Sequence, residues 1–100
     1  MKTSYNIGDI LTTKKNNLHC YFYVYDITIK FTPKVAPLIT DSKGEQYLSK
    51  YVKTLHWSRK NNAWQVHGLP LSKVEDKIAN ELKLKIDIKT LPYNNFQINE

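Results

Sequence analysis

The sequence predicts an α+β domain in which β-strands predominate, and three observations support this class. Residues 18–31 contain neither Gly nor Pro and are rich in β-branched and aromatic residues, which favour strands. Turn-forming residues separate several further short segments in which apolar and polar residues alternate. A stretch with the apolar spacing of an amphipathic helix follows these segments, late in the chain.

Residues 18–31 are predicted to form the central strand. From 18 to 24 the even positions are apolar, and after Asp26 the odd positions become the apolar ones. One extra residue near Tyr25–Asp26 restores a single core face, as a β-bulge does, and also bends the strand. A bent strand of this length can serve two sheets of a small barrel. The alternative is two strands with a break at Asp26.

The flanking segments are shorter. Asp9–Thr13 reads as a strand, and Lys14–Asn17 reads as a turn because Asn tolerates positive φ. The two prolines of Thr32–Pro37 predict a loop, since proline is unfavourable inside a sheet. Beyond it, Leu38–Thr40 and Glu45–Leu48 are predicted strands joined by a turn at 41–44, where Gly occupies the last position.

Residues 46–57 allow two interpretations. Their apolar side chains have helical spacing, but the same residues also suit a strand, which we predict over Tyr51–Ser58. The pair Asn61–Asn62 favours a hairpin turn, with Ala63–His67 as the partner strand. With a two-residue loop, the facing pairs are Trp57 with Val66 and His56 with His67.

The late helix is predicted to begin at Ser72, which with Glu75 forms a capping box, and to end near Lys83. Residues 78–84 resemble the positioning helix of bacterial helix-turn-helix domains. However, Lys83 replaces the turn Gly, and residues 84–88 alternate like a strand. The sequence therefore favours an amphipathic helix packed on the sheet. Its predicted buried stripe is Val74, Ile78, Ala79 and Leu82.

These elements predict a small, partly open barrel of SH3-like or OB-like type, with five to six short strands and one helix. The segment Ile7–Leu11 resembles the start of many SH3-like barrels. One domain is expected over residues 1–100, with an ordered core at about 7–91 and a polar tail at 92–100.

The composition favours some classes of binding partner and some cellular locations over others. The net charge is +6, and fourteen of the fifteen cationic residues are Lys, which favours polyanions without base-specific reading. No window is apolar enough for a membrane span and no secretory signal is apparent, so no membrane contact is expected. A single Cys20 fits a reducing cytoplasm, or the host cytoplasm if the protein is phage-encoded.

Two surfaces are candidates for binding. A row of three tyrosines lies opposite the apolar row of the central strand and offers a stacking platform, or else packs on its neighbours. Residues 50–64 interleave cations with aromatic rings, although Trp57 and Trp64 can instead anchor the core. The candidate nucleic-acid-binding residues are Lys50, Lys53, Trp57, Arg59, Lys60, Trp64, Tyr21, Tyr23 and Tyr25.

No motif fixes a chemistry. His19, Cys20, His56 and His67 lack the compact spacing of zinc ligands, and Cys20 lies on the apolar row. We therefore expect no enzymatic activity, no metal and no cofactor. The expected function is a basic module that contacts nucleic acid. The alternative is a small regulator or inhibitor of another protein, such as a phage-type inhibitor of a host factor.

Overall fold

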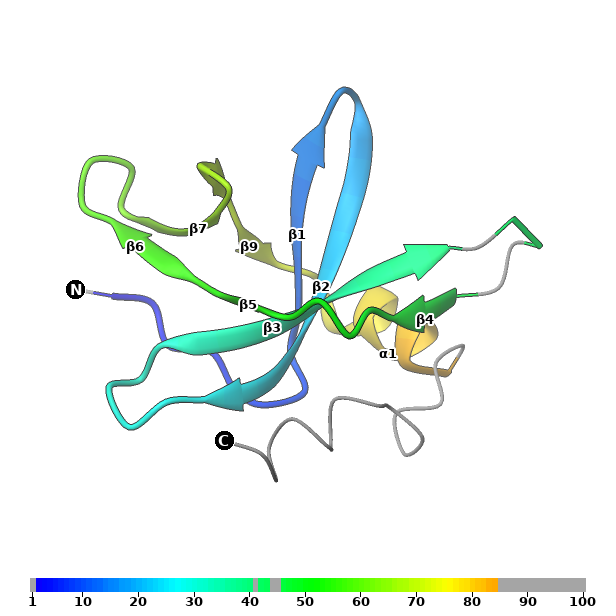
Figure 1. Cartoon of the computed structure of the whole chain (residues 1–100), viewed down its shortest axis with the longest axis horizontal. Coiled ribbons are helices and arrows are strands. Elements are labelled where there is room, and N and C mark those ends of the chain that lie inside the picture. The colour runs from blue at the N-terminus through cyan, green and yellow to red at the C-terminus, as the bar shows by residue number, and fades with distance from the viewer. Residues whose placement is uncertain (1, 41, 44–45, 85–100) are drawn as a thin grey trace.

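The computed structural model describes residues 2–40, 42–43 and 46–84. Their strands are β1 (Ile10–Lys15), β2 (Leu18–Ile27), β3 (Pro33–Thr40), β4 (Gln46–Leu48), β5 (Lys53–Thr54), β6 (His56–Ser58), β7 (Ala63–Val66), β8 (Leu69–Pro70) and β9 (Ser72–Lys73), and their helix is α1 (Asp76–Leu84). Two antiparallel sheets result (Figure 1). The larger has the order β4–β3–β2–β1–β9, with β5 also paired to β3, and the smaller has the order β6–β7–β8. Over the described residues neither sheet closes into a barrel, so the fold is mainly β with one short helix.

The larger sheet lies between two apolar layers, because its central strands bury side chains on both faces. One face packs on α1 through Ile10, Tyr23, Tyr25, Ala36, Leu48, Val74, Ala79 and Leu82. The other packs on the smaller sheet through Leu11, Phe22, Val24, Val35, Leu55, Trp64, Val66 and Leu71. Strand alternation thus supplies both cores, and each large side chain contributes about 1.5–3 kcal/mol by its burial.

β2 contains the predicted bulge. Val24 lies opposite Val35 and Asp26 lies opposite Lys34, which leaves Tyr25 as the extra residue. Because of this insertion, apolar side chains before and after the bulge reach the same cluster beside the smaller sheet. The prediction of one strand with a bulge is confirmed, and the alternative of two strands broken at Asp26 is wrong. The predicted strand extends to residue 31, however, and β2 ends at Ile27, so Ile29 and Phe31 are exposed and do not continue its apolar row.

β3 corrects the predicted loop at residues 32–37, because Pro33 and Pro37 both lie within this strand. Proline lacks a donor, but its carbonyl can still accept. The Pro33 carbonyl accepts from the Leu55 N–H at 3.0 Å, and the Pro37 carbonyl accepts from the Ser49 N–H at 2.7 Å. β3 pairs with β5 at its start and with β4 at its end. The prolines therefore remove few of the hydrogen bonds between neighbouring strands.

Two hairpins follow the predictions. Asn16 and Asn17 connect β1 to β2 with φ values of 53° and 66°, as a tight hairpin turn requires. β1 extends to Lys15, two residues further than predicted. β3 pairs with β4. Residues 41 and 44 of the predicted turn, and residue 45 of the predicted return strand, lie outside the described residues.

β5, β6 and β7 confirm strands and not a helix within 51–66, but the first predicted strand is broken at the buried Leu55, β7 ends at Val66 instead of His67, and the register differs. His56 lies opposite Gln65 and Trp57 opposite Trp64, because the loop spans the four residues 59–62 instead of two. The predicted pairs of Trp57 with Val66 and His56 with His67 are therefore wrong. The error is two residues, so each side chain keeps its predicted face of the strand.

α1 begins at Asp76, four residues later than predicted, because Ser72 belongs to β9 and pairs with Thr12 of β1. The predicted capping box is therefore wrong. Ile78 is 41% exposed, so it does not join the buried stripe, whereas Ala79 and Leu82 do. Leu84 ends α1 and does not begin a strand. The rest of the predicted last strand and the tail at 92–100 lie outside the described residues.

No helix in the described part of the chain has the length and apolar character that a membrane crossing requires.

Candidate functional site

Most of the aromatic residues that were predicted to contact nucleic acid lie inside the molecule. Tyr23, Tyr25 and Trp64 have exposed fractions of 8%, 6% and 2%, and Tyr21 and Trp57 are partly buried against the same two cores. A base cannot stack on the three buried rings unless the core opens. The expectation of a stacking platform is therefore wrong for Tyr23 and Tyr25, which instead pack on their neighbours, and Trp64 anchors the core, as the alternative for that residue stated.

Trp64 is held by specific contacts. Its Nε1–H donates to the Thr3 carbonyl at 2.7 Å, and its ring meets that of Trp57 edge-on, with 5.3 Å between centroids and an interplanar angle of 72°. The Lys2 ammonium lies 5.5 Å from the centroid of the Trp64 ring. Trp64 thus ties the N-terminal segment to the smaller sheet, a structural role.

The predicted cationic residues are on the surface. Lys50, Lys53, Arg59 and Lys60 are all exposed. Tyr51, which lies between the first two, is 71% exposed, and the Lys50 ammonium is 5.5 Å from its ring centroid. The sequence placed Tyr51 in the candidate stretch but favoured the tryptophans. Its exposure follows from its position between β4 and β5, where the chain leaves the sheet.

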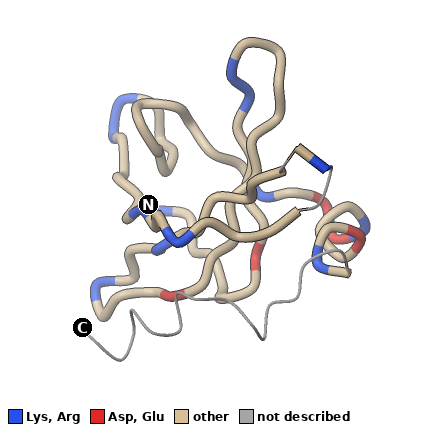
Figure 2. Tube along the Cα trace, turned by 45° about the vertical axis from the view of Figure 1, so that its right-hand side comes forward, with Lys and Arg blue, Asp and Glu red and all other residues tan. Residues whose placement is uncertain are grey.

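Charge is divided unevenly along the chain. Residues 1–72 contain ten cationic and four acidic side chains, whereas residues 73–100 contain five of each. Within the first part, residues 46–72 contain four cations and no acid, and we refer to them as the basic segment. Figure 2 shows several acidic positions at α1, whereas many of the Lys and Arg positions lie at hairpin tips. The positive potential therefore belongs to the strands and their loops.

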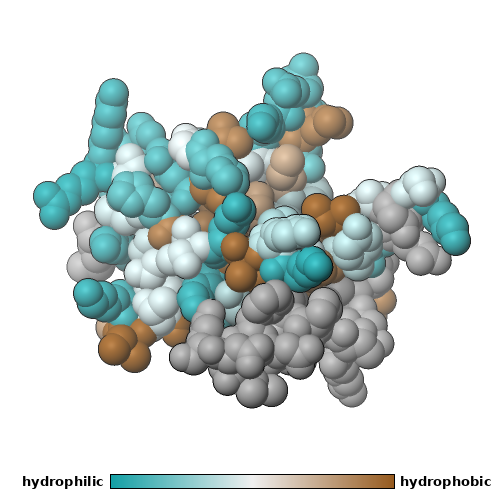
Figure 3. Space-filling model, viewed as in Figure 1, coloured by the Kyte–Doolittle hydropathy of each residue, from teal (hydrophilic) through white to brown (hydrophobic). Residues whose placement is uncertain are grey.

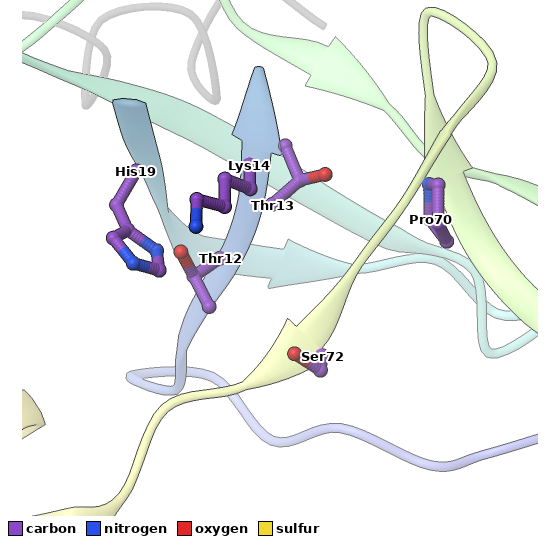
Figure 4. Close-up of a pocket in the computed structure, with 6 residues that line it drawn as sticks. All are labelled: Thr12, Thr13, Lys14, His19, Pro70 and Ser72. Atoms are coloured by element: carbon purple, nitrogen blue, oxygen red, sulfur yellow. The ribbon is translucent and has the colours of Figure 1, made fainter. Parts of the chain in front are cut away.

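A shallow hollow of about 290 Å³ opens beside the β1–β2 hairpin, lined by Thr12, Thr13, Lys14, His19, Pro70 and Ser72 (Figure 4). Lys14 and His19 are cross-strand partners, and their side chains lie near Thr12 in the close-up. The Thr12 hydroxyl donates to the Cys20 carbonyl at 3.0 Å. An ammonium, an imidazole and hydroxyl groups together suit an anionic oxygen. Sequence reasoning missed this hollow, because it depends on the packing of 70–72 against β1.

Within the described residues, no group of three or more His, Cys, Asp or Glu side chains is placed to bind a metal ion. His56 lies opposite Gln65, and Cys20 is partly buried on β2.

No known family model, curated protein or solved structure matches this chain. The function must therefore be argued from the charge, exposure and geometry of the chain's own residues.

Proposed function

We propose that this protein is a small non-enzymatic module that binds nucleic acid through its phosphates, without sequence specificity. One observation carries the proposal: the basic segment exposes its four cations and contains no acidic residue. Lys and Arg side chains at a phosphate backbone release condensed counterions, and this gain does not depend on base sequence. The expected cytoplasmic location is part of this proposal.

Two further features support the proposal. Tyr51 offers an exposed ring among the cations, and the hollow at Lys14 and His19 borders the end of the basic segment at Pro70 and Ser72. The SH3-like or OB-like architecture stays part of the proposal, because small bent sheets of these types can carry such a surface on strands and loops.

The proposal predicts that binding weakens steeply with salt. We would measure the anisotropy of labelled single-stranded and duplex DNA, and of RNA, at about 50 and 200 mM salt. Reversal of two cations in the variant Lys53→Glu/Lys60→Glu is expected to reduce the slope of log K against log salt by about two.

A matched control separates this site from net charge. The variant Lys77→Glu/Lys83→Glu changes the net charge by the same amount, but on α1. Weaker binding in the first variant and near-normal binding in the second supports the basic segment. Equal loss in both variants would assign the affinity to overall charge and reject a defined face, and absence of binding by the unmodified protein would reject the function.

Binding and regulation of another protein is the second candidate. The observation that favours it is the exposure of two apolar side chains, Ile29 and Phe31, at one hairpin tip. Tight binding to a purified protein that persists at about 1 M salt, where electrostatic attraction is screened, would distinguish it from phosphate contact.

A further inference from the structure

The connection between β2 and β3, Thr28–Thr32, projects two large apolar side chains from the molecule; we call it the tip loop. Ile29 is 96% exposed and Phe31 is 79% exposed, with Lys30 between them. Figure 3 shows hydrophobic side chains projecting at this end of the β2–β3 hairpin, at the lower left of the view. Leaving two such side chains in water forgoes about 1.5–3 kcal/mol each.

The tip loop is closed by its own hydrogen bonds. The Thr28 N–H donates to the Thr32 carbonyl at 3.0 Å, and the Phe31 N–H donates to the Thr28 carbonyl at 2.9 Å. The Thr28 hydroxyl oxygen accepts from the N–H groups of Lys30 and Thr32, at 3.3 and 3.1 Å. The loop is therefore ordered before any partner arrives, which lowers the entropy cost of binding.

Phe31 adopts a left-handed conformation with φ of 63°. It follows a turn closed by the Thr28 carbonyl, and hairpins of this kind usually place Gly at that position. A bulky residue there costs roughly 1–2 kcal/mol. The chain thus combines backbone strain with an exposed ring, and strain of this kind gathers at functional sites.

Part of the basic segment lies beside the strand that leaves this tip, because Lys53 of β5 is paired with Val35 of β3. β5 pairs with the first residues of β3, and the Leu55 N–H donates to the Pro33 carbonyl at 3.0 Å, directly after the tip loop. Figures 1 and 2 both place the β2–β3 tip and the β6–β7 loop, which carries Arg59 and Lys60, at the same end of the molecule as the N-terminus. A polyanion that extends along this end of the molecule would contact both the cations and the apolar tip.

We propose that the tip loop is a wedge that inserts Phe31, supported by Ile29, between base pairs of duplex DNA and kinks it. This inference rests on the proposed function and adds the form of the nucleic acid and its deformation. Phe and Ile are among the side chains that partially unstack base steps, kinking duplexes by about 20–90°, while surrounding cations hold the backbone. A projecting tip suits insertion, whereas stacking of single strands needs rings that lie along the surface.

The test is a bending assay on a duplex of about 20 base pairs that carries donor and acceptor dyes at its ends. We expect bound protein to raise energy transfer. The variant Phe31→Asn, which keeps the left-handed backbone but removes the ring, should lose this increase and bind the duplex roughly threefold to tenfold more weakly. The slope of log K against log salt should be unchanged for this variant, because no cation is removed. Tyr47→Asn, which removes an exposed ring from β4, is the matched control and should bend DNA normally.

Each outcome decides the question. Binding without bending by the unmodified protein overturns the wedge and leaves the proposed function intact. Bending by Phe31→Asn and by Ile29→Asn that equals the bending by the unmodified protein also overturns the wedge, and the exposed tip loop then favours the second candidate function, contact with a protein. No binding by the unmodified protein overturns the wedge together with the proposed function.

Discussion

The buried aromatic rings and the exposed tip loop make opposite use of hydrophobic side chains. Tyr23 and Trp64, which the sequence suggested as surface contacts, lie in the two cores, whereas Ile29 and Phe31 project into water. The difference follows from topology. β2 lies between two layers, so both of its faces are covered, while its continuation beyond Ile27 leaves the sheet. Exposure is thus set by position in the sheet more than by residue type.

This comparison predicts where substitutions will affect folding and where they will affect binding. The largest effect is expected for Trp64→Ala, which removes a side chain that is 2% exposed and leaves the Thr3 carbonyl without its donor. We expect a loss of about 3–5 kcal/mol in the free energy of unfolding, measured by urea denaturation. Lys53→Ala is the surface control and should change it by less than about 0.5 kcal/mol. A small effect of Trp64→Ala would contradict its structural role.

The tip loop depends on Thr28 in a different way. Thr28→Val keeps the shape of the side chain but removes the oxygen that accepts from two backbone N–H groups of the loop. Because water can partly replace this acceptor, we expect the unfolding free energy to fall by about 1–2 kcal/mol. The amides of Lys30 and Thr32 should exchange with solvent faster, which NMR can measure. Thr40→Val, near the end of β3, is the control substitution and should leave those amides unchanged.

Phe31→Asn should act in the opposite direction. Asn adopts positive φ more readily than Phe, and at Phe31 it also removes an exposed ring. We expect the free energy of unfolding to rise by roughly 0.5–1 kcal/mol, although the bending of DNA is lost. Asn17→Phe at the β1–β2 turn is the reverse substitution at a residue with positive φ, and it should lower the free energy of unfolding by a similar amount. Destabilisation by Phe31→Asn would mean that the ring supports the fold, and would remove the argument from strain.

The same comparison shows how much of the molecule the sequence could reveal. Alternation located β2 and its bulge, because period and phase are local properties of the chain. The face of β2 that bears Tyr23 could not be judged locally, since the layer that covers it depends on where α1 packs. The prediction of a loop at Pro37 failed for a similar reason. The Pro37 carbonyl accepts a hydrogen bond from the Ser49 N–H, and the sequence does not specify that partner.

The sequence also predicts one part of the candidate site and not the other. The cations at Lys50, Lys53, Arg59 and Lys60 could be predicted, because charged side chains stay in water in nearly every fold. The left-handed Phe31 could not, because no local pattern predicts a bulky residue where Gly is usual.

The smallest expected effect is a pH dependence of stability that comes from Tyr23. It tests whether the Tyr23 phenol is buried while the ring stays in the core. Burial raises the pKa of the Tyr23 phenol above its ordinary value of 10.0. Below pH 10 the phenol is protonated in both the folded and the unfolded state. Above it, the unfolded chain releases the proton first, so stability should fall as the pH rises from about 10 towards the raised folded pKa.

The pH dependence can be isolated with Tyr23→Phe, which keeps the ring and removes the titrating group. We would compare urea unfolding of both proteins between about pH 8 and pH 11, a range that spans the ordinary phenol pKa. Other groups, including Tyr5, whose pKa burial and the charge of Asp9 also raise, and the lysines, titrate in both proteins, so the difference between the two curves reports Tyr23. The unmodified protein should lose more stability than the variant as the pH rises. Parallel curves would place the Tyr23 hydroxyl in water in solution, and would reopen the tyrosine row as a surface for bases.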